Sequence, residues 1–179
     1  MTALHETSPL LVVAMGVSAT GKTAVGTELA DRLGMAFVEG DSHHPAANIE
    51  KMEAGTPLTD EDRQPWLEIL AELLAEAETA GQDTVLTCSA LRRVYRDTLR
   101  SAVRDADVFF LHLHAPFEVL EERMSQRTKH FMPTSLLQSQ FDTLEPLEED
   151  ETGAVVDVSP PLDQVVATAE KLVQEHRGG

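Results

Sequence analysis

The sequence has 179 residues, of which 42% are hydrophobic, and this length fits one domain with a buried core. Its 14 lysine and arginine residues against 31 aspartate and glutamate residues give a formal net charge of −17. Such a surface disfavours nucleic acid and anionic membranes as partners, because both need a basic footprint. The longest apolar run, Leu10–Met15, is too short to span a bilayer, and a single cysteine, Cys88, excludes an internal disulfide. We therefore expect a cytoplasmic protein with no membrane anchor.

Strand-like and helix-like stretches alternate along the chain after residues 1–9, a polar segment that we expect to form a flexible leader. Short apolar runs predict buried strands, and apolar positions that repeat every three or four residues predict helices. We expect strands at Leu10–Met15, Met35–Val38, Thr84–Cys88, Val108–Leu113 and Val155–Val158. We expect helices at Lys22–Leu33, Asn48–Ala54, Asp62–Ala80, Leu91–Arg100, Phe117–Gln126, Leu136–Phe141 and Asp163–Glu175. This alternation predicts an α/β three-layer fold, one domain over residues 10–179 with a parallel sheet of about five strands.

The segment GVSATGKT, from Gly16 to Thr23, matches the phosphate-binding pattern G-x-x-x-x-G-K-[ST] in full. It follows an expected strand and opens an expected helix, as the mechanism of this P-loop requires. Glycines let backbone N–H groups approach phosphate oxygens, and the helix adds its positive N-terminal end. We expect Lys22 to reach the β- and γ-phosphates and the Thr23 hydroxyl to ligate Mg²⁺. ATP and Mg²⁺ are thus the expected cofactors, held by Gly16, Ser18, Ala19, Thr20, Gly21, Lys22 and Thr23.

Polar side chains follow the second expected strand, where the sequence reads Glu39-Gly40-Asp41. Ligands of parallel α/β sheets bind at the carboxyl ends of strands, so Asp41 should face the γ-phosphate from the acceptor side. Its carboxylate can accept the proton of an attacking hydroxyl and can touch Mg²⁺ through water. The alternative is an aspartate that only caps the next helix. His44 suits a hydrogen bond to an acceptor, although a lone histidine is more often structural.

Longer patterns make the motif set more specific than a P-loop alone. Gly-Asp-x-x-His-Pro-x-x-Asn-Ile-x-Lys-Met runs from Gly40 to Met52, and Gly-x-Pro-Leu-x-Asp-x-Asp-Arg-x-Pro-Trp-Leu runs from Gly55 to Leu67. Further segments are CSALRRVYRDTLR at Cys88–Arg100, KHFM at Lys129–Met132 and QFDTLEP at Gln140–Pro146. With these segments in order over about residues 10–175, the sequence resembles the gluconokinases, small P-loop kinases that phosphorylate D-gluconate at its 6-hydroxyl.

The resemblance implies an enzyme that makes 6-phospho-D-gluconate and ADP, and it implies a homodimer. Two alternatives stay open: a small kinase for another hydroxy acid, such as shikimate or a different sugar acid, and a nucleotide-binding module without catalysis. Shikimate-type sites usually carry a Gly-Gly-Gly turn after the third strand, where this sequence has Cys88-Ser89-Ala90. That difference argues against shikimate and leaves a different sugar acid open.

Gluconate needs a cation for its carboxylate and small polar groups for its hydroxyls. Arg63 suits the carboxylate, because a guanidinium can grip it with two parallel hydrogen bonds. The alternative for Arg63 is a surface ion pair with Asp60 or Asp62. Ser89 and His44 suit the hydroxyls, and Arg92 would add positive charge at the same edge of the sheet. Arg92 shares a helix face with Arg96 at four-residue spacing, a pattern that is also typical of a solvated face.

By resemblance to small kinases, residues 122–135 form a lid over the nucleotide. Arg123 and Arg127 share a helix face there, and either could neutralise charge on the transferred phosphoryl group. Their alternative is ion pairing with Glu121 and Glu122. By the same resemblance, the turn at Asp157–Pro161 packs against adenine.

Two further expectations concern the backbone and the acidic run of the chain. Ala19 stands where gluconokinases commonly have glycine, so we expect a negative φ at that position. Residues 145–151 (EPLEEDE) should form a solvated loop.

Overall fold

The computed structural model of the chain describes residues 8–126 and 134–178. Five strands form one sheet in the order β2-β3-β1-β4-β5, and every pair of neighbours is parallel. The strands are β1 (Leu11–Met15), β2 (Ala36–Glu39), β3 (Thr84–Thr87), β4 (Val108–His114) and β5 (Gly153–Asp157). This arrangement confirms the predicted α/β three-layer fold with a parallel sheet of five strands.

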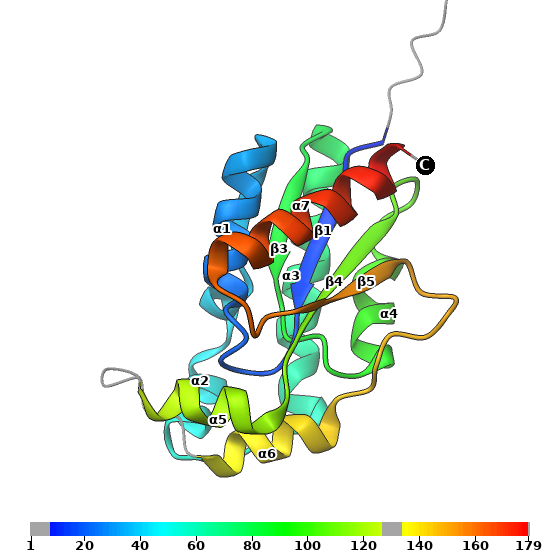
Figure 1. Ribbon diagram of the computed structural model, residues 1–179. Coiled ribbons are helices and arrows are strands. Elements are labelled where there is room, and N and C mark those ends of the chain that lie inside the picture. The colour runs from blue at the N-terminus through cyan, green and yellow to red at the C-terminus, as the bar shows by residue number, and fades with distance from the viewer. Residues whose placement is uncertain (1–7, 127–133, 179) are drawn as a thin grey trace, which may run out of the picture.

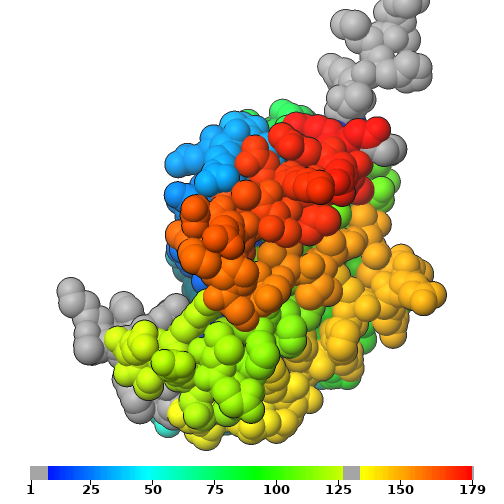
Figure 2. Space-filling model, in the orientation of Figure 1, coloured from blue at the N-terminus to red at the C-terminus, as the bar shows by residue number. Residues whose placement is uncertain are grey.

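Helices cover both faces of the sheet (Figure 1). On one face α1 (Lys22–Leu33) packs against α7 (Leu162–Gly178), and on the other α3 (Asp60–Ala80) packs against α4 (Arg93–Ser101). The shorter helices α2 (Ala46–Glu53), α5 (Phe117–Ser125) and α6 (Thr134–Thr143) lie around the carboxyl ends of the strands. Figure 2 shows α5 and α6 together at the surface below the start of α7. Across the described ranges, no helix is both long and apolar enough to cross a membrane.

The central strand β1 has a continuous apolar sequence because helices cover both faces of the sheet. All five of its residues, from Leu11 to Met15, are fully buried, because β3 and β4 flank the strand and helices lie over both its faces.

The helices of the domain start and stop at local sequence signals. A capping box between Thr59 and Asp62 opens α3, and Gly34, with a φ of 65°, ends α1. Local signals of this kind explain why most predicted bounds lie within a few residues of those in the structure.

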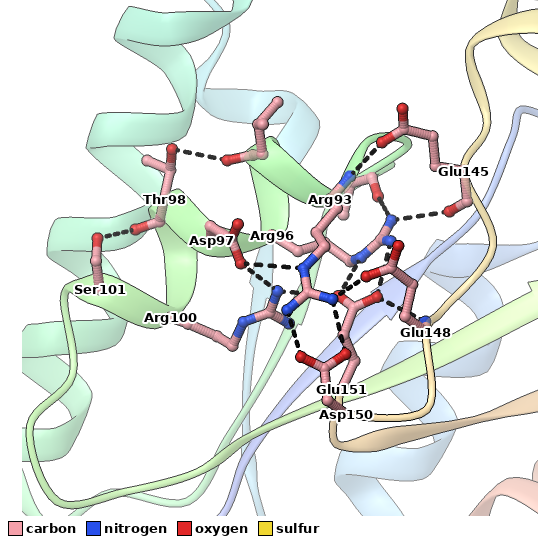
Figure 3. A network of polar contacts seen from close by, with 12 residues as sticks. Arg93, Arg96, Asp97, Thr98, Arg100, Ser101, Glu145, Glu148, Asp150 and Glu151 are labelled. Carbon is pink, nitrogen blue, oxygen red and sulfur yellow. Dashed lines mark hydrogen bonds and ion pairs between the residues drawn. The ribbon is translucent and has the colours of Figure 1, made fainter.

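A buried ion pair joins two residues, Arg96 and Glu151, that look solvated in the sequence (Figure 3). The guanidinium of Arg96 on α4 is fully buried and binds the Glu151 carboxylate through two hydrogen bonds of 2.7 and 3.0 Å. It also donates to the backbone carbonyls of Ala90, Glu145 and Pro146. The alternative of a solvated face is therefore wrong for Arg96. Residues 145–151 do form a loop whose other residues are exposed or half-buried, and Glu151 is its one buried exception. Two-point pairing and carbonyl acceptors offset the cost of removing both charges from water.

Candidate active site

The P-loop occupies the connection from β1 to α1, and its backbone has three residues with positive φ. Gly16 has a φ of 146°, and a Cβ there would lie 2.5 Å from the Leu113 carbonyl oxygen, so only glycine fits. Gly21, with a φ of 84°, immediately precedes α1. Ala19 has a φ of 69°, which corrects the negative φ expected for it. A non-glycine residue in this left-handed region costs about 1–2 kcal/mol, so the loop stores strain at Ala19.

Two P-loop side chains are held by oxygen atoms at the carboxyl edge of the sheet. The Lys22 ammonium folds back over the loop and donates to the carbonyl oxygens of Gly16 and Val17, each at 3.0 Å. The Thr23 hydroxyl lies 2.5 Å from Glu39 Oε2, and the Thr87 hydroxyl lies 2.5 Å from Glu39 Oε1. Glu39 was missed in the sequence analysis, although its place at the end of a strand, two residues before Asp41, was a usable signal.

Asp41 owes its position to the residue before it. A Cβ at Gly40 would lie 1.8 Å from the Thr87 carbonyl oxygen, so glycine is required for β2 to end this close to β3. The Gly40 N–H donates to the Thr87 hydroxyl at 2.9 Å, and its carbonyl accepts from the Trp66 indole at 2.8 Å. These contacts present Asp41, whose side chain is 68% exposed, to a cavity. Asp41 does not cap α2, because Pro45 holds that position.

His44 is a buried, neutral histidine with a fixed orientation. Its ring stacks on Trp66 at 4.0 Å between centroids, and its side chain is only 4% exposed. Burial lowers the pKa of His44, and the attraction of Asp41 only partly opposes this. The Asn48 side-chain amide donates to the Asp62 carbonyl at 2.8 Å and lies 3.3 Å from Nδ1 of His44. Nδ1 is thus the acceptor, which leaves the ring proton on Nε2, 4.0 Å from the Asp41 carboxylate.

Arg63 is a buried cation that faces the same cavity without a carboxylate partner in the described part of the chain. It is 9% exposed, and its Nη1 donates to the Tyr95 hydroxyl at 2.9 Å. Tyr95 in turn donates to Asp60. The expected alternative, an ion pair of Arg63 with Asp60 or Asp62, is absent, because Asp62 pairs with Lys51 at 2.8 Å and Asp60 pairs with Arg92.

The cavity has a volume of about 860 Å³, a size typical of small-molecule sites. Most of the site residues predicted from the sequence line this cavity. They belong to the P-loop, to the acceptor side and to the end of β3, and they are Ser18, Ala19, Gly21, Lys22, Thr23, Asp41, His44, Arg63 and Ser89. Gln140 from α6, to which the sequence analysis gave no role, also lines it. Gly16 and Thr20 lie in the loop behind this wall, where the Thr20 hydroxyl donates to the Val17 carbonyl at 2.9 Å.

Two predicted arginines lie elsewhere. Arg92 precedes α4 outside the cavity wall, where Asp60 and Glu145 bind its guanidinium, so the structure does not support a direct contact with substrate. Arg123 donates to the Val158 carbonyl and lines a second cavity of about 200 Å³ with Val158, Pro160 and Leu162. It therefore faces the turn after β5 and neither Glu121 nor Glu122. Arg127 and the KHFM segment lie outside the described residues.

A P-loop at the carboxyl edge of a parallel sheet defines a P-loop nucleotide-binding protein, and the adjoining cavity with Asp41 and Arg63 leaves room for a phosphoryl acceptor. Residues 11–147 match a family model described as an AAA domain. The chain is 51% identical to the gluconokinase of Gluconobacter oxydans over 151 residues, which cover 82% of this chain and 84% of that protein. It therefore belongs to the gluconokinase family.

Two solved structures agree with this assignment. A sugar kinase from Janibacter sp. HTCC2649 superposes with a TM-score of 0.88 and is 49% identical, with 93% of this chain and 95% of that one covered. A gluconokinase from Sinorhizobium meliloti 1021 superposes with a TM-score of 0.83 and is 45% identical, with 93% of each chain covered.

Proposed function

We propose that the protein transfers the γ-phosphoryl group of ATP to the 6-hydroxyl of D-gluconate, giving 6-phospho-D-gluconate and ADP. Arg63 carries this proposal, because its buried guanidinium lines the cavity with only a neutral hydroxyl as its partner in the described chain. A cation in that setting favours an anionic ligand, and a carboxylate fits its planar fork of donors. Membership of the gluconokinase family supports gluconate as the acid.

The acceptor's hydroxyls have suitable partners beside Arg63. The Nε2–H of His44 is a fixed donor, because the stack on Trp66 and the contact with Asn48 set the ring's orientation. Ser89, at the end of β3, lines the same wall. With the carboxylate held at Arg63, these groups orient the sugar chain toward the P-loop, which lowers the entropic cost of the reaction.

Asp41 is the group we assign to the attacking hydroxyl. In the reaction, a bond forms between the 6-oxygen and the γ-phosphorus while the bond from that phosphorus to the β,γ-bridging oxygen breaks. The bonding electron pair leaves with ADP, and the hydroxyl proton passes to the Asp41 carboxylate. Lys22, already at the phosphate cradle, neutralises charge on the β- and γ-phosphates.

The residues present fit a Mg²⁺ ion, which prefers oxygen ligands. The Thr23 hydroxyl and the Glu39 carboxylate lie 2.5 Å apart, and Asp41 lines the same cavity. We assign Thr23 as a direct ligand, with Glu39 and Asp41 acting through water. When bound, Mg²⁺ supplies positive charge to the β- and γ-phosphate oxygens.

The second cavity suits the adenine of ATP. Arg123 lies there against the turn after β5, the segment that the resemblance placed beside the base. A guanidinium can stack on an aromatic ring, so we assign Arg123 to the base rather than to the transferred phosphoryl group. The role of Arg127, the lid, the homodimer and the cytoplasmic setting stay predictions.

An acceptor panel tests the proposed function. Purified protein with Mg-ATP should release ADP when gluconate is added, and should respond far less to shikimate or other sugar acids. Asp41→Asn should lower turnover at least about a hundredfold, because general-base catalysis contributes on that order, and should leave ATP affinity unchanged. Absence of gluconate-stimulated ADP release from the wild type would refute the proposal, and a fully active Asp41→Asn would remove Asp41 from the mechanism.

A further inference from the structure

We propose that the side-chain amide of Gln140 donates a hydrogen bond to the transferred phosphoryl group and that the P-loop itself holds this amide in the required orientation. The inference rests on the proposed phosphoryl transfer and adds a residue to it. Gln140 belongs to a helix outside the P-loop and outside the acceptor wall, and no part of the site described above explains its presence there.

Gln140 sits on a helix that is firmly packed. Leu136 and Leu137 of α6 are 4% and 0% exposed, so one face of the helix is part of the core. The Phe141 ring packs edge-on against Phe117 of α5, with 5.5 Å between ring centroids. A side chain projecting from such a helix is placed more reproducibly than one on a loop.

One hydrogen bond fixes the orientation of the Gln140 amide. The backbone N–H of Ser18 donates to Gln140 Oε1 at 2.7 Å, a contact between residues 122 positions apart. A backbone N–H can only donate, so the oxygen of the amide must face the P-loop. The two N–H donors at the other end of the planar amide therefore point away from the loop, and Gln140 lines the 860 Å³ cavity.

The anchored end of the P-loop is the end that meets the γ-phosphate. Lys22 reaches the β- and γ-phosphates in this motif, and its ammonium lies 3.0 Å from the carbonyl oxygens of Gly16 and Val17. Ser18 is the next residue, so Gln140 stands beside the transferred group. A fixed neutral donor there stabilises negative charge on the equatorial oxygens without the cost of burying another cation. The Ser18 N–H polarises the amide through the carbonyl and strengthens its donors.

Replacement of Gln140 by glutamate separates this role from simple anchoring. Gln140→Glu keeps the side-chain length and the oxygen that accepts from Ser18, but it replaces the donor with a negatively charged oxygen. We expect kcat to fall at least about a hundredfold, as for loss of one preorganised donor. A non-hydrolysable ATP analogue should bind at least about tenfold more weakly, whereas ADP, which lacks the γ-phosphate, should bind within about twofold of the wild type. If Gln140 only anchors the loop, the variant will keep both kcat and analogue affinity, and the proposal is wrong.

Gln138→Glu is the matched control, because Gln138 lies on the exposed side of α6 and gains the same charge. It should leave kcat and both affinities within about twofold, since an exposed charge is screened by water and salt. Equal losses in the two variants would show a general charge effect and overturn the proposal. The comparison of analogue with ADP does not depend on the acceptor, so it tests Gln140 even if gluconate proves to be the wrong acid. Thermal unfolding of both variants identifies any loss caused by misfolding.

Discussion

Arg96 and Arg63 are both buried guanidinium groups, but the protein surrounds them differently. Arg96 has a carboxylate, Glu151, and three backbone carbonyls as acceptors, so the fold itself supplies partners for its N–H donors. Arg63 has the hydroxyl of Tyr95 and an open cavity. Under the proposed function, the contrast separates a stabilising cation, Arg96, from a cation proposed to bind a ligand, Arg63. What matters is how many of its donors the protein itself satisfies.

Both environments come from one short helix. Tyr95 and Arg96 are neighbours on α4, yet Tyr95 supports Arg63 at the cavity while Arg96 turns toward the loop before β5. Burial would raise the pKa of Glu151, but hydrogen bonds from Arg96 and Arg100 outweigh it and hold that pKa below its ordinary value. The carboxylate therefore stays ionised inside the protein, and the ion pair links α4 to the loop before β5.

The largest effect on stability should come from breaking the Arg96–Glu151 ion pair. Arg96→Leu leaves the buried Glu151 with Arg100 as its remaining cation, and we expect the free energy of unfolding to fall by about 3–5 kcal/mol in urea titrations. Adding Glu151→Leu to this variant should recover part of the loss, because no uncompensated charge remains. Arg93→Leu, which breaks half-exposed pairs with Glu148 and Asp150, should cost at most about 1 kcal/mol. Equal losses for Arg96 and Arg93 would contradict the special status of the buried pair.

The cavity arginine should show the opposite pattern, a loss of activity without a loss of stability. Arg63→Leu removes the carboxylate partner of gluconate, so we expect kcat/KM for gluconate to fall about 100–1,000-fold, or roughly 3–4 kcal/mol. Affinity for an ATP analogue should stay unchanged, and the free energy of unfolding should not fall. Arg63→Lys keeps the charge but not the fork of donors, and its kcat/KM should lie in between. A large stability loss in Arg63→Leu would show that the protein, and not a ligand, uses this cation.

His112 on β4 extends the comparison, because it is buried without a hydrogen-bond partner in the described part of the chain. Neither ring nitrogen has a hydrogen-bond acceptor or donor within the described ranges. Burial, with smaller contributions from His114 and Arg96, lowers its pKa from 6.5 to about 4. Between about pH 6.5 and pH 4, His112 therefore binds a proton in the unfolded chain but not in the folded one. Stability should therefore fall as the pH drops from about 6.5 to 4, by up to about 3 kcal/mol from this group.

The measurement is urea unfolding of wild type and His112→Leu at several pH values between 7 and 4. The variant removes a group that must stay neutral in the fold, so its stability should depend less steeply on pH. His44 has a lowered pKa as well, which leaves part of the slope in place. The same slope in both proteins would mean that His112 does not destabilise the fold in acid.

The smallest effect concerns the strained backbone on the cavity side. Ala19→Gly relieves about 1–2 kcal/mol of left-handed strain but adds about 0.4–1 kcal/mol of unfolded-state entropy. We therefore expect a net gain of about 0–1.6 kcal/mol in thermal or urea unfolding. Ala30→Gly, inside α1, is the matched control and should lose about 1 kcal/mol, because that position is helical. Destabilisation at both positions would exclude strain at Ala19.

The sequence predicted those parts of the molecule that depend on local patterns. The P-loop, the five strands and the parallel sheet follow from a motif and from apolar runs that need no knowledge of distant contacts. Asp41, His44 and Arg63 were also found, since strand ends and family segments mark them, and all three line the cavity. Their roles in catalysis and binding stay predictions.

What the sequence analysis missed depends on contacts across the fold. Arg96 and Glu151 are 55 residues apart, and each looks like a solvated charge within its own segment. Gln140 meets Ser18 across 122 residues. In both pairs the deciding partner belongs to a different element. The positive φ of Ala19 was also missed, because no residue pattern near Ala19 reports it.

Trp66 gives the protein an intrinsic fluorescent reporter at the acceptor side of the cavity. It is the single tryptophan of the chain, its indole N–H holds the Gly40 carbonyl, and its ring is covered by His44 at the cavity wall. An acceptor that contacts His44 will change the surroundings of this one fluorophore. Emission at tryptophan wavelengths should therefore follow acceptor binding without a label and without nucleotide, so affinity for a sugar acid can be measured separately from turnover.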